Sequence, residues 1–456
     1  MSGFHIENFG CRAARADGEA LDGRLRALSA SQPLAGDVVV VNTCSVTAEA
    51  DREARAYIRR AHRQNPSARI VVTGCYAQRA PAELAQMPGV AAVIGNSHKA
   101  LAPEIIVSLS GPSAPPLPQA LIPVDSLTGI HEHVRIWVDD CFAHSFIEET
   151  PLAPGVQTRP NLKIQEGCSN RCTFCVIPLT RGPSRSMPHA VVLRQVRDFV
   201  AAGGKELVLS GINLGRFSSG SGGETLARMV RTVFEQSELP RLRLSSIEPM
   251  DWNDELIALM GEFGGTRLAR HAHLPLQSGS DAVLRRMHRR YRPWHYADKV
   301  AALLRAAGPD LTLGADVMAG FPGETDREFE ETLDFLRALP FGYLHLFPFS
   351  PRPNTPGWQL HRADPVALEV IEERMAALRV LAAEKTLANR SRFLGRTLPV
   401  ITLRTPAALA RQGRTAALSE NFLPVELEGL SPANQLVQAR VTRLSQVNSL
   451  LALPLQ

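Results

Sequence analysis

The sequence lacks the long apolar segments and the leader that membrane and secreted proteins carry. No run of eighteen apolar residues occurs in its 456 residues, and the amino terminus has no basic stretch followed by an apolar one. We therefore expect neither a membrane span nor a secretory signal, and we expect a cytosolic protein. With 45% hydrophobic and 21% charged residues, the chain is long enough for two or three globular domains.

Cysteine is scarce, and its number is odd. Seven cysteines in a reducing compartment are expected to be ligands, nucleophiles or small core residues rather than disulfide partners.

Lysine is absent from the last part of the chain. From Asn389 onward there are eight Arg and three Glu, a net charge of +5 that equals the formal charge of the whole protein. A basic appendage on a neutral body suggests contact with a polyanion, although a solvated basic face explains the charge equally well.

The first hundred residues alternate apolar, β-branched runs with Ala, Arg and Glu-rich stretches of helical length. This alternation predicts βαβ units and a parallel sheet. The predicted strands are FHIENFGC (4–11), DVVVVNTC (37–44), ARIVVTGC (68–75) and VAAVIGN (90–96).

Three of these runs end in cysteine. Cys11, Cys44 and Cys75 are 33 and 31 residues apart, and one βαβ step takes about 30 residues. The three thiols should therefore recur at the carboxyl ends of parallel strands, where open α/β sheets hold their ligands. The alternative is that each cysteine is a small buried hydrophobe, but three in register favour a shared ligand site.

The middle of the chain predicts a linker and then a second α/β region. Residues 111–159 are Pro-rich, with one possible strand, VRIWVDDCF, and with Cys141 as an ordinary thiol. Six strands at spacings of roughly 30 to 45 residues then predict a partial (β/α) barrel, and Thr325 with Glu328 predicts a helix capping box. These strands are LKIQ (162–165), ELVLSG (206–211), RLRLSSI (241–247), RHAHLPL (270–276), LTLGADVMAG (311–320) and YLHLFPF (343–349).

The last seventy residues contain only short strand-like runs with Gly and Pro turns, which predicts a small antiparallel barrel. We accordingly expect a multidomain α/β protein: a parallel, Rossmann- or flavodoxin-like domain, a linker, a partial barrel and a small β-barrel. The predicted boundaries are 1–112, 113–153, 154–386 and 387–456.

Three cysteines stand close together after the first barrel strand, in GCSNRCTFCV. Cys168, Cys172 and Cys175 have the spacing C-x3-C-x2-C. Zinc sites commonly use four ligands from paired knuckles, whereas three thiolates in this spacing suit an iron–sulfur cluster with one open position.

This motif, with an aromatic residue before its last cysteine and a barrel around it, resembles the radical S-adenosylmethionine (SAM) enzymes. The resemblance implies a [4Fe-4S] cluster on the triplet, whose fourth iron chelates SAM and cleaves it to methionine and a 5'-deoxyadenosyl radical. The order of strand-end cysteines, triplet and basic β-barrel resembles the methylthiotransferases, whose first domain carries a second [4Fe-4S] cluster and whose last is called TRAM. Within that family, seven motifs are most similar to the enzymes acting on threonylcarbamoyladenosine in tRNA, and the segment after Cys44 is the most informative of them. The motifs are NFGCR, VVNTCSVTAEAD, KIQEGCSNRCTFCVIPLTRG, LSSIEP, HLPLQSGSDAVLRRMHRRY, GFPGETDREFEET and FPFSPRPNTP.

Cofactor contacts are expected at the ends of the barrel strands. Gly211 permits close backbone approach to the amino acid part of SAM, and Ser246 with Glu248 suits the ribose hydroxyls. Phe174 and Phe321 are expected to enclose the adenine. Turn or cap roles are the alternative for each position. The predicted contacts are Phe174, Gly211, Ser246, Glu248, Gln277 (followed by Ser278) and Phe321.

Arginines are the expected RNA contacts. One run lies beside His288 and Tyr291, and a solvated helix face is its alternative; Arg290 or Tyr291 instead suits SAM. His271 and His273 lie on one face of a strand, where packing or a hydrogen bond is favoured over a metal pair. The candidate arginines are Arg285, Arg286, Arg289, Arg290 and Arg292 in the run, and Arg390, Arg392, Arg396, Arg404, Arg411, Arg414, Arg440 and Arg443 in the tail.

The resemblance implies insertion of a methylthio group at C2 of N6-threonylcarbamoyladenosine, at position 37 of tRNA. The partners would be a tRNA anticodon stem-loop, an electron donor and a sulfur donor. Two alternatives remain at this point: a methylthiotransferase acting on isopentenyladenosine or on a ribosomal protein aspartate, and a non-enzymatic RNA protein that holds zinc on the triplet.

Overall fold

The computed structural model describes residues 3–31, 34, 36–109, 134–142, 147, 149, 152, 158–220, 223–445 and 449–455. The chain forms two compact units. The first contains Met1–Pro151, Gln165–Arg185 and Ser350–Thr355, and the second contains Leu152–Ile164, Ser186–Phe349 and Pro356–Gln456. Among the described helices, none has the length and apolar character needed to cross a membrane. The predicted domain boundaries stay a prediction, and most of the predicted linker lies outside the described residues.

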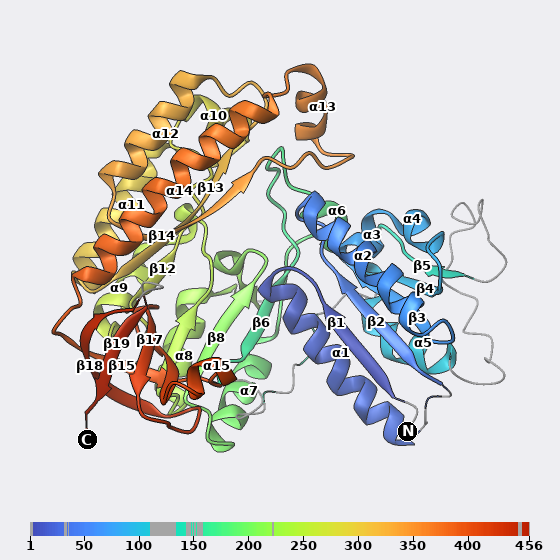
Figure 1. Ribbon diagram of the computed structural model, residues 1–456, viewed down its shortest axis with the longest axis horizontal. Helices are drawn as coiled ribbons and strands as arrows, with labels where there is room; N and C mark the ends of the chain where they lie inside the picture. Colours follow the sequence, from blue (N-terminus) through green and yellow to red (C-terminus); the bar gives the residue numbers. More distant parts are fainter. Residues whose placement is uncertain are drawn as a thin grey trace. The chain divides into compact units, whose positions relative to one another are not determined.

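A five-stranded parallel sheet forms the centre of the first unit, which confirms the prediction of a parallel α/β domain (Figure 1). Its strands follow chain order, without the reversal that defines a doubly wound sheet. The strand predicted inside the linker pairs with β4 as the fifth member. The strands are β1 (Phe4–Asn8), β2 (Val38–Thr43), β3 (Arg69–Gly74), β4 (Val90–Gly95) and β5 (Arg135–Trp137).

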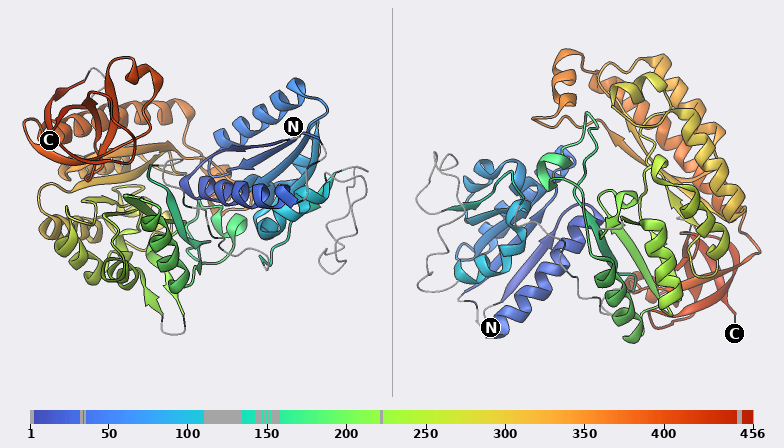
Figure 2. Two further views of the ribbon diagram at one scale, coloured as in Figure 1. Left: turned by 90° about the horizontal axis from the view of Figure 1, so that it is seen from below. Right: turned by 180° about the vertical axis from the view of Figure 1, so that it is seen from behind.

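Two apolar cores in this unit draw on the sheet and on different helices. Leu25 of α1 and Ile105 of α5 pack with Val40 in one core, and Ile58 of α2 packs with Val72 in the other. Figure 2 shows these helices around the sheet. The helices of the unit are α1 (Arg12–Ser31), α2 (Ala48–Gln64), α3 (Cys75–Arg79), α4 (Pro81–Ala85), α5 (Ala102–Leu109) and α6 (Ile177–Arg181).

The six predicted barrel strands are all present, but they belong to two sheets. One has the order β11-β8-β6-β7 and the other the order β12-β13-β14. The sheets meet where Ile247 donates its backbone N–H to the carbonyl of His273. The strands are β6 (Asn161–Glu166), β7 (Arg185–Ser186), β8 (Glu206–Gly211), β11 (Arg241–Leu244), β12 (His271–His273), β13 (Thr312–Ala319) and β14 (Phe341–Pro348), with a small hairpin of β9 (Ser218–Ser219) and β10 (Glu224–Thr225).

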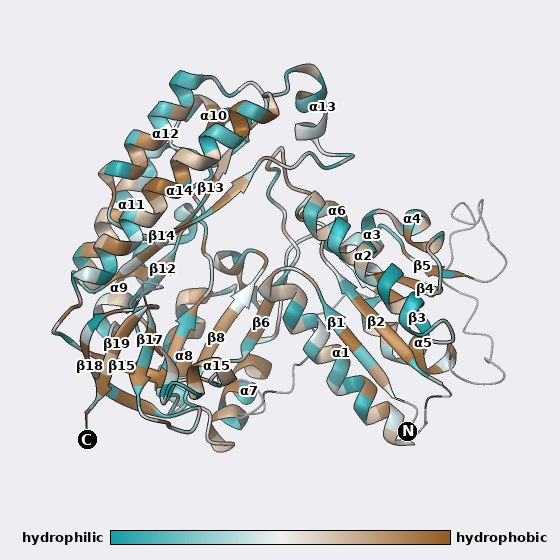
Figure 3. Ribbon diagram, viewed as in Figure 1, coloured by the Kyte–Doolittle hydropathy of each residue, from teal (hydrophilic) through white to brown (hydrophobic). Residues whose placement is uncertain are grey.

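Helices cover the outer side of these strands because their apolar faces need a partner layer. In Figure 3 the strands β13 and β14 are largely hydrophobic, while hydrophilic residues gather on the helices beside them. The capping box of Thr325 and Glu328 at the start of α12 is confirmed. The helices are α7 (His189–Ala201), α8 (Leu226–Gln236), α9 (Asp254–Phe263), α10 (Asp281–Arg286), α11 (Pro293–Ala307), α12 (Asp326–Ala338), α13 (Pro356–Ala363) and α14 (Leu368–Ser391).

A buried carboxylate marks the start of β8. Glu206 pairs with Arg243 at 2.9 Å, Arg241 at 3.3 Å and Arg159 at 3.5 Å. Burial acts to raise the pKa of Glu206, but the three guanidinium groups outweigh it and lower that pKa below its ordinary value.

The tail forms a closed barrel with the strand order β15-β16-β17-β19-β18, which confirms the predicted small barrel. One pair, β17 with β19, is parallel, so the barrel is not antiparallel throughout as predicted. Closure removes the exposed strand edges that a short sheet would leave. Arg270 joins Glu420 of this barrel at 2.6 Å, and Arg396 joins Asp310 at 2.7 Å. The elements are β15 (Thr397–Thr402), α15 (Ala407–Ala410), β16 (Arg414–Ser419), β17 (Pro424–Glu428), β18 (Leu436–Leu444) and β19 (Leu450–Pro454), the last of which was not predicted.

Candidate functional site

The three strand-end cysteines of the first unit lie together. Cys44 directly follows β2, Cys75 is the first residue of α3, and Cys11 lies three residues beyond β1. The side chains of Cys11 and Cys44 share a hydrogen bond, and Cys75 is close enough to interact electrostatically with both. Parallel strands with matched registers therefore assemble one sulfur site from three distant positions.

Gly10 makes the approach of the first two cysteines possible. Its φ is +94°, and a Cβ at this position would lie 2.2 Å from Cys44 Cβ and 2.6 Å from Cys44 Sγ. Any other residue would combine left-handed strain with a steric clash. The glycine at this position therefore leaves room for the sulfur of Cys44.

The hydrogen bond with Cys44 lowers the pKa of Cys11 to about 6 and raises that of Cys44. Burial raises the pKa of Cys75, against the opposing effect of a nearby guanidinium. Cys11 is exposed, whereas Cys44 and Cys75 are buried. The site therefore combines one exposed cysteine with two buried ones, and three neighbouring thiols suit a metal cluster better than three inert core residues.

A buried arginine, which was not among the predicted site residues, contacts this site from the helix that follows the second cysteine motif. Arg181, the last residue of α6, donates its Nε to Cys75 Sγ at 3.2 Å. Its Nη1 donates to Glu166 at 2.8 Å and to Asp17 at 3.0 Å. Lys99 pairs with the same two carboxylates at 3.5 and 2.5 Å.

These four charged groups balance one another, so a thiolate at Cys75 would face the guanidinium of Arg181. Burial alone would lower the pKa of Arg181, but Cys75 and the two carboxylates raise it above its ordinary value. Asn96 adds a second donor, with its Nδ2 at 3.4 Å from Cys75 Sγ. A lone arginine inside the apolar run VIPLTRG was the only sequence signal for this network.

The close triplet occupies the loop between β6 and α6, as predicted. Cys168, Cys172 and Cys175 are each half-buried, and so is Phe174. The backbone N–H of Asn170 donates to Cys168 Sγ at 3.4 Å. The loop belongs to the first unit, where α6 packs against α3, so all six cysteines belong to one compact unit.

The segment after Cys44 is held by a second buried arginine. Asp51 of α2 accepts hydrogen bonds from Arg352 at 2.6 Å and from Arg79 at 2.9 Å. Arg352 lies in FPFSPRPNTP, and Asp51 ends VVNTCSVTAEAD. Two of the motifs that resemble the threonylcarbamoyladenosine enzymes are therefore in direct contact in the first unit.

Several predicted cofactor contacts lie at the ends of the barrel strands. Gly211 ends β8 and is partly exposed. Ser246 is exposed and hydrogen-bonds His273 Nδ1 at 2.6 Å. Glu248 is partly exposed and accepts from Arg289 at 2.5 Å.

Gln277 is buried at the end of the fourth predicted barrel strand, and its φ is +68°. A non-glycine residue in this region is strained and often marks a functional position. Its neighbour Ser278 is fully buried, with its Oγ at 3.0 Å from Thr332 Oγ1, so a structural role explains Ser278.

Two of the predicted aromatic residues are buried, and their contact with SAM stays a prediction. Phe321 is fully buried and packs edge-on against Phe349, with ring centroids 5.4 Å apart. Tyr291 is also buried, and its hydroxyl donates to the carbonyl of Leu276 at 2.6 Å. Both rings serve the packing of the barrel because their motifs fold back against apolar neighbours.

Arg289, a predicted RNA contact, is buried, and its role stays a prediction. Its side chain is 4% exposed and pairs with Glu248. Arg286 pairs with Glu328 at 2.7 Å and Arg285 with Asp281 at 2.8 Å, while Arg290 is exposed. The run is thus divided between buried and surface positions, because its helix ends at residue 286 and the chain then turns.

The tail arginines divide in the same way. Arg390 is half-buried, Arg392 donates to the carbonyl of Leu311 at 3.0 Å, and Arg396 pairs with Asp310. Arg414 pairs with Glu426 at 2.9 Å. Four exposed arginines have no ion-pair partner among the described residues: Arg404, Arg411, Arg440 and Arg443.

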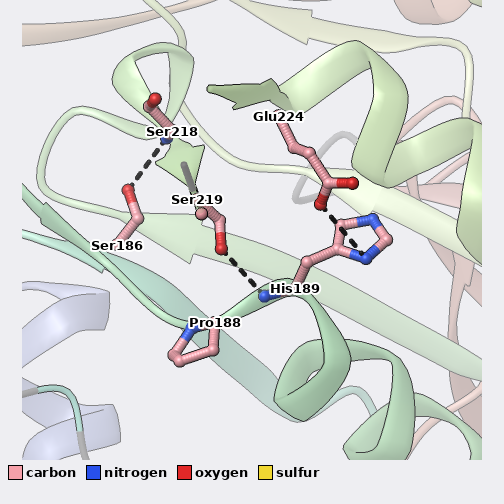
Figure 4. Close-up of a pocket in the computed structure, with 7 residues that line it drawn as sticks. Ser186, Pro188, His189, Ser218, Ser219 and Glu224 are labelled. Carbon is pink, nitrogen blue, oxygen red and sulfur yellow. Dashed lines mark hydrogen bonds and ion pairs between the residues drawn. The ribbon is translucent and has the colours of Figure 1, made fainter. Parts of the chain in front are cut away.

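A separate pocket of about 500 Å³ lies beside the β9–β10 hairpin (Figure 4). His189 and Glu224 face each other across it at 3.4 Å, and Ser219 accepts a hydrogen bond from the backbone N–H of His189. No predicted site residue lines this pocket. Cys141, also outside the site, is exposed, as expected of an ordinary thiol.

Comparison with known proteins agrees with this geometry. The family described as "Radical SAM superfamily" matches residues 162–336, which contain the close triplet, and "Uncharacterized protein family UPF0004" matches residues 3–95, which contain the three strand-end cysteines. Radical SAM enzymes use S-adenosylmethionine and a [4Fe-4S] cluster, so these are the cofactors of this chain.

Relatives are similar along most of the chain. The threonylcarbamoyladenosine tRNA methylthiotransferase MtaB of Bacillus subtilis is 34% identical over 86% of this chain and 82% of its own length. The MtaB of Rickettsia prowazekii is 31% identical over 97% and 95%. The tRNA-2-methylthio-N(6)-dimethylallyladenosine synthase of Acidothermus cellulolyticus is 31% identical over 96% and 83%.

The fold is also similar to a solved structure. The radical S-adenosylmethionine methyltransferase TsrM from Kitasatospora setae superposes with a TM-score of 0.54 at 15% sequence identity, covering 78% of this chain and 77% of that one. The match concerns the fold alone. Taken with the full-length relatives and the two cysteine sets, it leads to one conclusion: the chain belongs to the radical SAM methylthiotransferase family.

Proposed function

We propose that this enzyme adds a methylthio group to C2 of N6-threonylcarbamoyladenosine at position 37 of tRNA. The observation that carries the proposal is the assembly of Cys11, Cys44 and Cys75 into one site, in the same unit as the close triplet. An enzyme with a single cluster has no need of a second set of three thiols, whereas thiolation requires a place for sulfur.

The residues fit two iron–sulfur clusters. Each set offers three neighbouring thiols, and Cys75 already receives hydrogen bonds from Arg181 and Asn96. Such donors to sulfur and a balanced local charge are the usual means by which a protein stabilises a cluster. We assign the first cluster to Cys11, Cys44 and Cys75, and the second to Cys168, Cys172 and Cys175.

When bound, SAM and the second cluster supply a carbon-centred radical, which is what attack at the unactivated C2 of adenine demands. The chain's own task is to position the base and to exclude water. We assign Phe174, Gly211, Ser246, Glu248 and Gln277 to SAM. The pairing with Arg289 holds the carboxylate of Glu248 in place.

The choice of threonylcarbamoyladenosine rests on the relatives and on the paired motifs. The two MtaB enzymes named above align over most of their length, and the Asp51–Arg352 contact joins two of the segments that resemble such enzymes. We place the reaction in the cytoplasm, with a cellular electron donor and a sulfur donor as further partners.

The tail barrel is our candidate for the RNA contact, in the role that a TRAM domain has. Its exposed, unpaired arginines suit phosphate binding, because each guanidinium can form two hydrogen bonds without losing an existing partner. Arg440 and Arg443 both lie on β18. Replacing both by Gln should weaken tRNA binding and reduce its salt dependence, whereas Arg396→Gln should act mainly on stability through Asp310.

The decisive experiment offers the reconstituted enzyme two tRNA substrates. Under reducing, anaerobic conditions with SAM, one anticodon stem-loop carries threonylcarbamoyladenosine and the other isopentenyladenosine at position 37. Mass spectrometry should detect the methylthio product only from the first, together with 5'-deoxyadenosine. If only the second stem-loop is methylthiolated, the substrate is isopentenyladenosine and not threonylcarbamoyladenosine. If 5'-deoxyadenosine forms without either product, a tRNA substrate is refuted.

A further inference from the structure

Three polar side chains from neighbouring strands meet on one face of the β12-β13-β14 sheet. His273 ends β12, Asp316 lies in β13 and His345 in β14. Asp316 and His345 are directly paired in the parallel register, and His273 is paired with Gly314, two residues before Asp316. Paired residues of neighbouring parallel strands share a face, so the three side chains emerge side by side from a rigid sheet.

Each of these side chains offers one ligand atom, and the three atoms lie within 4.8 Å of one another. His273 Nε2 and His345 Nδ1 both lie 3.3 Å from Asp316 Oδ1. Among the described residues, His273 Nε2 has no hydrogen-bond partner of proper geometry, although it is buried. Two side chains that both direct their ligand atoms at one metal ion bring those atoms close together without the alignment of a hydrogen bond. His273 Nε2 and Asp316 Oδ1 have this arrangement.

The neighbours of His273 fix its ring. Ser246 Oγ lies 2.6 Å from Nδ1, so Nδ1–H can donate to Ser246 and leave the lone pair on Nε2. The ring of Tyr343 stacks on His273 with an interplanar angle of 13°. Gly314 provides room for this tyrosine, because a Cβ there would lie 2.1 Å from the Tyr343 ring.

We propose that His273, Asp316 and His345 bind one divalent transition-metal ion of the zinc class. Two imidazoles and one carboxylate are a common ligand set for such ions. The exposed fractions of the side chains rise from 6% at His273 through 22% at Asp316 to 53% at His345. The site is therefore anchored in the protein and open on one side, which leaves a coordination position for an oxygen or nitrogen of a ligand.

A hydrogen-bonded triad without an ion is the competing explanation. In such a triad each histidine N–H would be aligned with the carboxylate. His345 Nδ1 meets this condition at 3.3 Å, whereas His273 Nε2 lies at the same distance without the alignment. The proposal does not depend on the tRNA substrate or on the clusters, since none of the six cluster cysteines takes part.

The test is zinc binding by the full chain carrying its iron–sulfur clusters. After equilibration with micromolar Zn²⁺ and desalting, zinc and iron are measured together by mass spectrometry, and the zinc environment by X-ray absorption. We expect one zinc per chain, with nitrogen and oxygen ligands at about 2.0 to 2.1 Å and no sulfur at about 2.3 Å. His345→Ala and Asp316→Asn should each lower the zinc content at least tenfold while the iron content stays unchanged.

The matched control is His295→Ala, since His295 is an exposed histidine that is not part of the proposed zinc site. It should retain zinc and iron. The proposal is overturned if the wild-type chain takes up no zinc, if the zinc stays bound after His345→Ala, or if the zinc has sulfur ligands, which would place it on cysteines. A variant that loses iron as well as zinc is replaced by His273→Gln, with the same expected loss of zinc alone.

Discussion

The buried guanidinium of Arg181 should control both the stability of the first unit and the properties of its cluster. The informative change is Arg181→Gln, which removes the charge and keeps an amide donor. Arg181 is 1% exposed and contacts Glu166, Asp17 and Cys75 at 2.8, 3.0 and 3.2 Å. In the variant, the two buried carboxylates lose this cation, while Lys99 still pairs with both.

The magnitude follows from the cost of leaving a buried charge without its partner. Removing one member of a buried ion pair costs about 3 to 5 kcal/mol. For a unit of this size, that loss lowers Tm by about 10 °C. The cluster should respond too: because cations and hydrogen bonds to sulfur stabilise the reduced state, their loss should make the reduction potential of the first cluster more negative.

The assay has two readouts. Thermal unfolding of the chain prepared without iron measures the stability, and a redox titration followed by electron paramagnetic resonance measures the potential. Arg171→Gln is the control, because Arg171 is an exposed residue of the triplet loop. If Arg181→Gln behaves like this control in both readouts, the network does not hold Cys75 and the reasoning is refuted.

Three further predictions concern separate parts of the chain. Cys44→Ala and Cys172→Ala should each reduce the iron from about eight to about four per chain, with iron analysis as the check, and full iron in either variant would exclude that cysteine as a ligand. Glu206 has a lowered pKa, so its stabilisation is complete above its ordinary pKa and is lost as the pH falls through the lowered one. Glu206→Gln should therefore cost about 3 kcal/mol near neutral pH and flatten the acid dependence of the urea midpoint; an unchanged dependence would contradict the pairing. Asp51→Asn should weaken the contacts with Arg79 and Arg352 and lower the free energy of unfolding by about 3 kcal/mol in the same urea assay. A loss below about 0.5 kcal/mol would show that this contact is as weak as a surface ion pair.

The sequence predicted the strands well because their patterns are local. Every predicted strand of the sheet and of the partial barrel is present, and a spacing near thirty residues correctly placed Cys11, Cys44 and Cys75 at neighbouring strand ends. The pairing of the predicted linker strand with β4 and the two-sheet division of the barrel depend on long-range contacts, which local patterns do not encode.

Side-chain roles were harder to predict, because burial decides them. Arg289 and Arg290 are adjacent in the sequence, yet one is buried against Glu248 and the other is exposed. Phe321 was expected at a ligand, and its ring packs against Phe349. Arg181 was not predicted at all, because its role depends on contacts with Asp17, Cys75 and Glu166 that no local sequence pattern indicates.

The central claim, that a sulfur site assembled from three strand ends serves tRNA thiolation, is tested most directly in cells. In a strain lacking this gene, nucleosides from total tRNA are measured after complementation with the wild-type chain or with Cys44→Ala. We predict that 2-methylthio-N6-threonylcarbamoyladenosine returns only with the wild-type chain and that its unmethylthiolated precursor accumulates with the variant. Restoration of the methylthio nucleoside by Cys44→Ala, or its presence in the strain that lacks the gene, would contradict the claim.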